Sequence, residues 1–519
     1  MKLLAERFLR WPVKHEGALD RNPDTALPGT PTPKKEAPLA IQPDIPIIFV
    51  PGTSGTSLDT SKSFNHEFTG DRHTFPEICL TCSLGSSTHG DEVFQYNPAG
   101  SDPAGPRIWI GPEAVGHLLA EAVNANRGSH YFDVLQFDGS GQNTLFPQIG
   151  AGTVLQKVNL DPAGIITHGV YDSLVNFLTI DITGPRRPLN NGSNGLYLFA
   201  YDWRGDLPDQ AQQLGMFVDC VLQRPEVRAA HIQKVALLTH SLGGPVARTY
   251  YLSSPANVAK VDQVISLAGG FGGIILPIKI LTMGDNWTLG FGSGPISVGF
   301  ADWEGQALAQ NWGTAYFQIP NSDLWFSDDT HNGGTFNRAY IRDDRQAPIL
   351  THSASMAWLQ LYYNTLITNS AETFFTNPLL PAMGDFRGGT GNIPHHRIIS
   401  KGITNTVLAV HISIGTSDEC QFLTQLGLPV DPAESTPIVR YDVVTGDGDG
   451  TVPYHGLLGS IAASEDRVYI LDNVDHVGIT ANADVHTLIQ HLLDGTVTNQ
   501  TQVSATFHSP FDAGVHELP

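Results

Sequence analysis

The sequence predicts an α/β fold, with a mostly parallel, doubly wound sheet and helices on both of its faces. Short apolar runs recur at Ile45–Val50, Val235–His240 and Val261–Gly269, and each has the length of a buried strand. A helical stretch around Leu207–Leu222, and another that follows His240, separate these runs. Such alternation of strand and helix is typical of a parallel sheet that is covered on both faces.

Later segments continue the same pattern. A strand is expected to end at Trp203, and the runs Ile438–Val444 and Val468–Val474 are expected to add further strands to the sheet. The last helix has apolar residues at positions i, i+3, i+4 and i+7, namely Val485, Leu488, Ile489 and Leu492.

The chain is expected to divide into four parts. Residues 1–42 form a Pro-rich N-terminal tail, and residues 43–269 form the first part of the core, with lid-like loops at 55–115. Residues 270–394 are aromatic and irregular, which predicts a cap inserted into the core. Residues 395–519 form the second part of the core and a C-terminal tail.

The charge balance excludes several kinds of partner. The 519 residues include 29 basic and 51 acidic side chains, a net charge of −22. A nucleic-acid partner is not expected, because it requires a basic face. Charge alone also cannot bring the protein to an anionic membrane.

No secretion signal and no transmembrane segment are expected. Glu6 interrupts the N-terminal apolar stretch, and the strongest apolar run, Val264–Ile278, contains glycines and Pro277. We therefore expect a cytoplasmic rather than a secreted protein, with peripheral membrane contact. Cys79 and Cys82 are compatible with free thiols, a local disulfide or a zinc site; no second cysteine pair supports zinc, so no metal is expected.

The first chemistry-bearing motif is Thr239-His-Ser-Leu-Gly-Gly. Ser241 lies between a predicted strand and a predicted helix, which is typical of a nucleophile elbow. The tight turn requires small neighbours two positions away; Gly243 satisfies this, whereas Thr239 replaces the usual glycine.

An acid and a histidine follow in the order that a serine triad requires. Asp449 lies in Gly446-Asp-Gly-Asp-Gly-Thr-Val, after a predicted strand, and His476 follows the last strand. The acid motif could also be a simple Asp-Gly turn; a calcium loop is excluded because Leu458 stands at its twelfth position. The chain order Ser, Asp, His is that of α/β-hydrolases.

A glycine-containing loop follows the first strand at Pro51-Gly-Thr-Ser-Gly. It predicts one half of an oxyanion hole, with the Thr53 N–H paired to the Leu242 N–H. A phosphate-binding loop is the alternative, but the Gly-Lys-Ser/Thr signature is absent.

Together these motifs resemble the lecithin:cholesterol acyltransferase family, which includes lysosomal phospholipases and phospholipid:diacylglycerol acyltransferases. The resemblance covers about residues 45–60, 195–290 and 440–495. It rests on Val-Pro-Gly at Val50, Tyr-Asp-Trp-Arg at Tyr201, His-Ser-Leu-Gly at His240, the glycine-rich segment at Leu267 and the acid loop at Gly446. Phe271 stands where the family has tryptophan.

The resemblance implies an α/β-hydrolase fold with a cap and a serine-dependent acyl transfer to water or an alcohol. The implied triad is Ser241, Asp449 and His476, with Asp449 preferred over Asp447, and Trp203 and Phe271 are expected to bind substrate. No cofactor is needed. The expected partner is a lipid ester at a membrane or lipid-particle surface.

Two alternatives to this function stay open: a carboxylesterase or lipase acting on small or neutral esters, and a binding module without activity. The apolar cluster Ile274, Ile275, Leu276 and Ile278 has two interpretations as well. It belongs either to a mobile lid over an acyl-chain channel or to a region simply buried under the cap.

Overall fold

The protein is described from a computed structural model. The chain divides into two units, Met1–Ile41 and Gln42–Pro519. The structure describes only residues of the second unit: 45–60, 107–109, 135–147, 149–159, 167–178, 195–284, 302–320, 340–345, 349, 351–376, 393–415, 438–459, 467–497 and 507. Cys79, Cys82, most of the lid-like segment 55–115 and parts of the cap segment lie outside the described residues.

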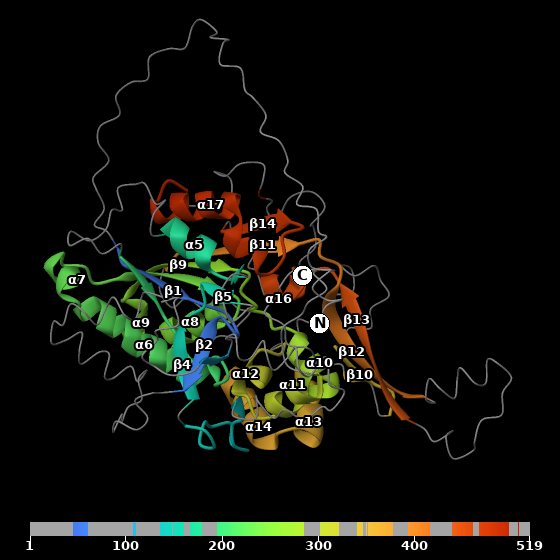
Figure 1. The fold of residues 1–519 in the computed structure, drawn as a ribbon. Helices are drawn as coiled ribbons and strands as arrows, with labels where there is room; N and C mark the ends of the chain where they lie inside the picture. The colour runs from blue at the N-terminus through green and yellow to red at the C-terminus, as the bar shows by residue number, and fades with distance from the viewer. Residues whose placement is uncertain are drawn as a thin grey trace, which may run out of the picture. The chain divides into compact units, whose positions relative to one another are not determined.

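A six-stranded parallel sheet forms the centre of the second unit (Figure 1). Across the sheet the strands follow the order β14, β11, β9, β8, β1, β7. All pairs are parallel, so the carboxyl ends of the strands meet at one edge. The strands are β1 (Ile47–Val50), β7 (Leu196–Leu198), β8 (Val235–His240), β9 (Val261–Leu267), β11 (His395–Lys401) and β14 (Val468–Asp472).

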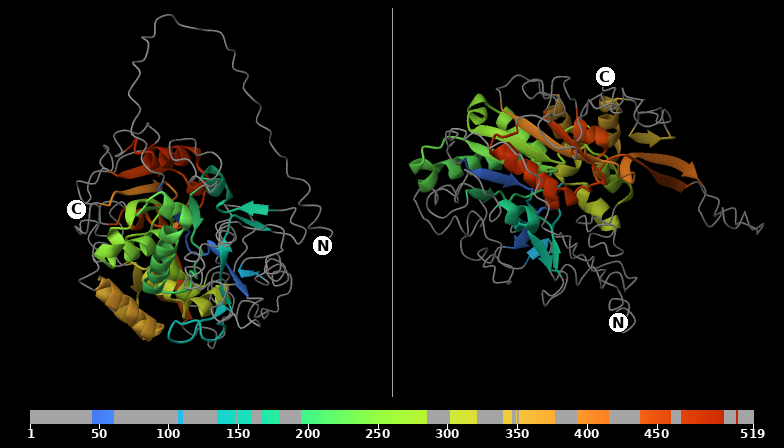
Figure 2. Two further views of the ribbon diagram at one scale, coloured as in Figure 1. Left: turned by 90° about the vertical axis from the view of Figure 1, so that its left-hand side faces the viewer. Right: turned by 90° about the horizontal axis from the view of Figure 1, so that it is seen from above.

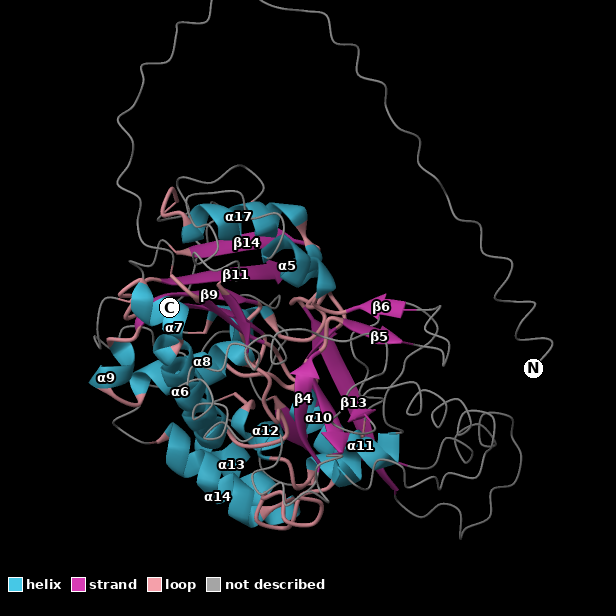
Figure 3. Ribbon diagram, turned by 60° about the vertical axis from the view of Figure 1, so that its left-hand side comes forward, coloured by secondary structure: helices cyan, strands magenta, loops and turns pink. Residues whose placement is uncertain are grey.

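Alternate residues of these strands enter two separate hydrophobic clusters. Ile48 and Leu237 pack with residues of α6 (Leu207–Gln223) and α8 (Gly243–Leu252). Phe49 and Leu238 pack instead with residues of α5 (Asp172–Asn176) and α17 (Ala483–Leu493). Because successive strand residues point to opposite faces, the two clusters are the two faces of the sheet. Figure 3 shows the strands between these helix pairs, which confirms the α/β class and its doubly wound arrangement.

The second unit contains three smaller sheets besides the central one. One is an antiparallel sheet of β2 (Thr56–Thr60), β3 (Arg107–Trp109) and β4 (Ile149–Val154), and one is the pair β5 (Lys157–Asn159) and β6 (Thr167–Gly169). The third contains β10 (Ile341–Asp343), β12 (Thr406–Gly415) and β13 (Ile438–Gly446). The pair β12–β13 extends away from the central sheet (Figure 2, orange).

Three expectations about strands are corrected by the structure. The strand expected to end at Trp203 is β7, which ends at Leu198. The run Ile438–Val444 does form a strand, but β13 pairs antiparallel with β12 and not with the central sheet. Its side chains are mostly partly or fully exposed, in contrast to the buried central strands. The expectation of loops over 55–115 is wrong for residues 56–60 and 107–109, which form β2 and β3.

The segment 270–394 is mainly helical where it is described. It contains α10 (Leu276–Met283), α11 (Asp302–Ala309), α12 (Gly313–Phe317), α13 (His352–Tyr362) and α14 (Thr365–Phe375), together with β10. Ile274, Ile275 and Ile278 are buried here, as the second interpretation of the apolar cluster expects. The remaining short helices are α7 (Pro225–Ala229), α9 (Pro255–Val258), α16 (Tyr454–Leu458) and the 3-10 turn η5 (Gly478–Ala481).

Within the described ranges, no helix combines the length and the apolar character that crossing a membrane requires.

Candidate active site

Ser241 occupies a strained turn between β8 and α8. Its φ is +52°, a left-handed conformation that non-glycine residues rarely adopt. The Ser241 N–H donates to the Leu267 carbonyl at 2.9 Å, which links the turn to the end of β9. A Cβ at Gly243 would lie 2.2 Å from the Val50 carbonyl oxygen, so only glycine fits there. Thr239 is accommodated because it is still within β8, where it is fully buried between β1 and β9.

Asp449 and His476 are brought together at the same edge of the sheet. The His476 Nδ1 lies 2.6 Å from Asp449 Oδ2, and the His476 N–H donates to the Asp449 carbonyl at 2.8 Å. The other carboxylate oxygen, Oδ1, accepts from the Thr451 N–H at 3.0 Å and from the Val452 N–H at 2.7 Å. Asp449 is 1% exposed, so its carboxylate forms hydrogen bonds with these protein groups and is shielded from solvent.

Asp447, the alternative acid, faces elsewhere. Its Oδ1 accepts a hydrogen bond of 2.6 Å from the Gly402 N–H, just after β11. The geometry therefore pairs Asp449, and not Asp447, with His476.

His240 is a neighbour of the serine in sequence and of His476 in space. It directly precedes Ser241, its ring centroid is 4.9 Å from that of His476, and its Nε2 is 2.8 Å from the His476 carbonyl oxygen. Burial, with a smaller contribution from His476, lowers the pKa of His240 to about 3. Among the described residues, Ser241 and His476 form no hydrogen bond with each other.

The loop after β1 lies directly against the serine. A Cβ on Gly52 would be 2.7 Å from Ser241 Cβ and 3.2 Å from its Oγ. In the part of the chain that the structure describes, neither the Thr53 N–H nor the Leu242 N–H donates to another residue. Leu242 is the N-cap of α8, whose N-terminus favours negative charge. Both amides are thus available to an anion that forms beside Ser241.

Buried side chains from distant segments hold this loop in place. The Tyr201 hydroxyl donates to the Pro51 carbonyl at 2.8 Å, and the Trp109 indole donates to the Ser54 carbonyl at 3.3 Å. The Thr53 hydroxyl lies 3.4 Å from Gln318 Oε1, at the end of α12. Among these contributors only Tyr201 lay in a motif, and the motif did not indicate its role.

Trp203 and Phe271, the expected substrate-binding residues, are both buried. The Trp203 indole donates to the Thr56 carbonyl at 3.1 Å, and its ring packs edge-on against Trp109 and Trp312. Phe271 is 1% exposed and packs edge-on against His395. Both side chains are thus packed in the interior, and contact with a substrate stays a prediction.

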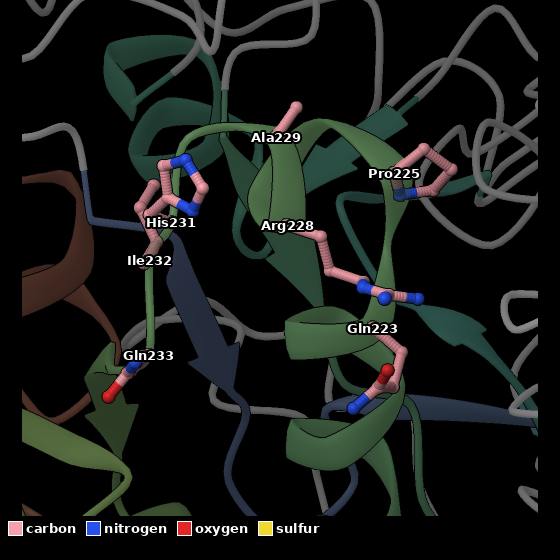
Figure 4. Close-up of a pocket in the computed structure, with 7 residues that line it drawn as sticks. All are labelled: Gln223, Pro225, Arg228, Ala229, His231, Ile232 and Gln233. Carbon is pink, nitrogen blue, oxygen red and sulfur yellow. The ribbon is translucent and has the colours of Figure 1, made fainter.

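A cavity of about 600 Å³ lies around α7, next to the amino-terminal end of β8 (Figure 4). Its lining residues are Gln223, Pro225, Arg228, Ala229, His231, Ile232 and Gln233. They immediately precede β8, whereas Ser241 follows it, so a strand of roughly 20 Å separates the two. The cavity is therefore not part of the candidate active site.

No three His, Cys, Asp or Glu side chains converge in the described ranges as a metal centre would require.

One segment of the chain is similar to a known family. Residues 191–293 match the sequence model of the lecithin:cholesterol acyltransferase family, and this segment contains the Tyr201–Arg204 motif, Ser241 and Phe271. The resemblance found in the sequence is therefore confirmed over that segment. No curated protein sequence matches the chain.

Two solved structures are similar at low sequence identity. A chain of the Tle4–Tli4 complex shares 12% identity, with a TM-score of 0.41, over 88% of this chain and 99% of that one. Mature lipase BlEst2 from Bacillus licheniformis shares 13% identity, with a TM-score of 0.27, over 57% of this chain and 78% of the lipase.

Proposed function

We propose that this protein is a serine-dependent lipid acyl hydrolase or O-acyltransferase that acts on phospholipid-type esters through an acyl-serine intermediate. The observation that carries the proposal is the buried Asp449–His476 pair beside a strained serine. The serine lies in the segment that matches an acyltransferase family.

The first step is proton transfer from Ser241 to His476. Asp449 accepts the Nδ1–H of His476, which leaves Nε2 unprotonated and able to act as the base. As the Ser241 oxygen attacks the ester carbonyl, His476 takes its proton and Asp449 stabilises the resulting imidazolium. The leaving alcohol then receives that proton, and the acyl group remains on Ser241.

The negative charge of the tetrahedral intermediate falls on the former carbonyl oxygen. The N–H groups of Thr53 and Leu242 are the proposed donors to this oxygen, and the N-terminus of α8 adds a favourable dipole. In the second half of the reaction His476 activates water or an alcohol, which attacks the acyl-serine. The choice between these acceptors decides between hydrolase and acyltransferase.

We propose a lipid aggregate as the site of action. The net charge of −22 disfavours attraction to anionic lipid, so apolar contact must supply the affinity for the surface.

Active-site labelling tests the mechanism. A fluorophosphonate probe should label the wild-type protein and not the Ser241→Ala variant. The variant should keep the wild-type unfolding midpoint and lose about 10⁴-fold or more in kcat. An unlabelled wild-type protein would favour a binding module, and a variant that retains turnover would exclude the serine mechanism.

Product analysis tests the substrate class. Mixed phospholipid dispersions, with and without an added long-chain alcohol, should yield free fatty acid and, if transfer occurs, the alkyl ester. Turnover of short soluble esters without any turnover of phospholipid would favour the carboxylesterase alternative.

A further inference from the structure

A row of buried hydrogen bonds crosses the site behind Ser241. The Gly52 N–H donates to the Tyr171 hydroxyl at 3.0 Å. The same hydroxyl lies 2.8 Å from His240 Nδ1, and His240 Nε2 lies 2.8 Å from the His476 carbonyl oxygen. Tyr171 and His240 are 2% and 3% exposed, so no solvent substitutes for these partners.

The two ends of the row fix its first and last hydrogen bonds. An amide N–H can only donate and a carbonyl oxygen can only accept, so Gly52 donates to the Tyr171 oxygen and His240 Nε2–H donates to the His476 carbonyl. Burial disfavours a charged imidazole, so His240 is neutral and its Nδ1 carries no proton. The middle hydrogen bond is then donated by the Tyr171 hydroxyl to His240 Nδ1.

The row joins the two halves of the proposed catalytic machinery. Gly52 precedes Thr53, one of the two proposed oxyanion donors. At the other end, the backbone of His476 is also held by Asp449 through the His476 N–H. The rings pack closely as well, with centroids 5.5 Å apart for Tyr171 and His240. A shift at either end of the row is therefore transmitted to the other.

We propose that Tyr171 and His240 are positioning residues, which set the distance between the oxyanion loop and the catalytic histidine. This inference rests on the function proposed above. Neither side chain needs to touch the substrate; each acts through the backbone that it holds. The lowered pKa of His240 agrees with the arrangement, because protonation of Nδ1 would remove the acceptor for Tyr171.

Tyr171→Phe is the most direct test, because it removes one hydroxyl and preserves the ring. The matched control is Tyr469→Phe, which breaks a buried Tyr–His contact of 3.2 Å with His396, away from the serine. We expect Tyr171→Phe to lower kcat about tenfold with KM nearly unchanged, since small displacements of catalytic groups are costly. Tyr469→Phe should lower the unfolding midpoint by a similar amount and leave kcat unchanged.

Two variants of His240 separate positioning from packing. His240→Leu fills the space but has neither donor nor acceptor, whereas His240→Gln keeps one of each. We expect His240→Gln to recover most of the kcat that His240→Leu loses. The double variant Tyr171→Phe/His240→Leu should be no slower than the slower single variant, because both break the same row.

Three results would overturn the inference. They are a Tyr171→Phe variant with the kcat of Tyr469→Phe, a His240→Gln variant as slow as His240→Leu, and losses that multiply in the double variant. A wild-type protein that neither hydrolyses esters nor reacts with the fluorophosphonate would instead overturn the proposed function, and this inference with it.

Discussion

Asp449→Asn is expected to remove activity because it changes which ring nitrogen of His476 carries the proton. The hydrogen bonds around Asp449 show why. Its Oδ1 accepts from two backbone N–H groups, those of Thr451 and Val452. In the variant, only the amide oxygen can occupy that position, because an NH₂ group would oppose two donors. The NH₂ group is therefore forced into the position of Oδ2, against His476 Nδ1.

An NH₂ group at that position can only donate, so His476 Nδ1 becomes an acceptor and the ring proton moves to Nε2. The imidazole then cannot accept the proton of Ser241. A triad whose histidine is held in the wrong tautomer loses about 10⁴-fold in kcat, equivalent to about 5 kcal/mol of transition-state stabilisation. KM should change little, because no contact with the substrate is lost.

The assay is steady-state hydrolysis of a chromogenic ester, with the unfolding midpoint measured for each variant. Asp447→Asn is the matched control. Its Oδ1 has one backbone donor, the Gly402 N–H, and an asparagine oxygen satisfies that donor equally well. We expect less than a threefold effect for Asp447→Asn. Equal losses in the two variants, or full activity in Asp449→Asn, would refute the assignment of the acid and the argument from forced orientation.

Three further predictions concern stability and the turn. Burial lowers the pKa of both His240 and His396 to about 3, so the unfolded chain binds more protons below pH 6.5. The urea concentration at half unfolding should therefore be lower at pH 5 than at pH 7, and this difference should be smaller in His396→Gln. A urea midpoint that is higher at pH 5 would contradict the prediction. Arg204→Met should lower the free energy of unfolding, measured by urea denaturation, by about 3 kcal/mol, because the Arg204 side chain is fully buried and ion-paired. The control is Arg228→Met at an exposed position, which should change the free energy of unfolding by less than about 0.5 kcal/mol. Gly243→Ala should lower the free energy of unfolding by about 1–3 kcal/mol and remove most of the ester hydrolysis, because the added Cβ would clash with the backbone. A variant with the wild-type rate of ester hydrolysis would contradict this prediction.

Much of the sheet could be predicted because its strands are buried on both faces. The runs that end at Val50, His240 and Leu267 are rich in Val, Ile and Leu and almost wholly buried, which is how parallel strands appear in sequence. The acid and the histidine could be proposed because each follows a predicted strand. Parallel strands deliver the residues that follow them to one edge of the sheet, whatever their distance along the chain.

The elements that the sequence did not reveal have a common cause. β11 reads His-His-Arg-Ile-Ile-Ser-Lys, and only its centre is apolar, so nothing in its pattern marks a central strand. β13 has the length of a strand, but its partner β12 decides which sheet it joins. In both cases the missing information is a tertiary contact.

The same limit explains the interpretation of Trp203. A tryptophan in a motif near a candidate active site suggests a substrate contact, whereas its indole N–H donates to the Thr56 carbonyl, 147 residues away. A buried indole requires an acceptor, and sequence spacing does not identify a partner at that distance.

The oxyanion loop depends on such distant contacts, yet their separation along the chain costs little. Its tethers span from 55 residues, for Trp109 and Ser54, to 265 residues, for Gln318 and Thr53. Loop-closure entropy grows only with the logarithm of length, so the longest tether costs about 1.4 kcal/mol more to close than the shortest. The partner side chains are already fixed by the core, and each hydrogen bond contributes about 1 kcal/mol. The loss of one tether should therefore shift the loop and slow the reaction without unfolding the protein, which is why variants at this loop are best judged by kcat rather than by stability.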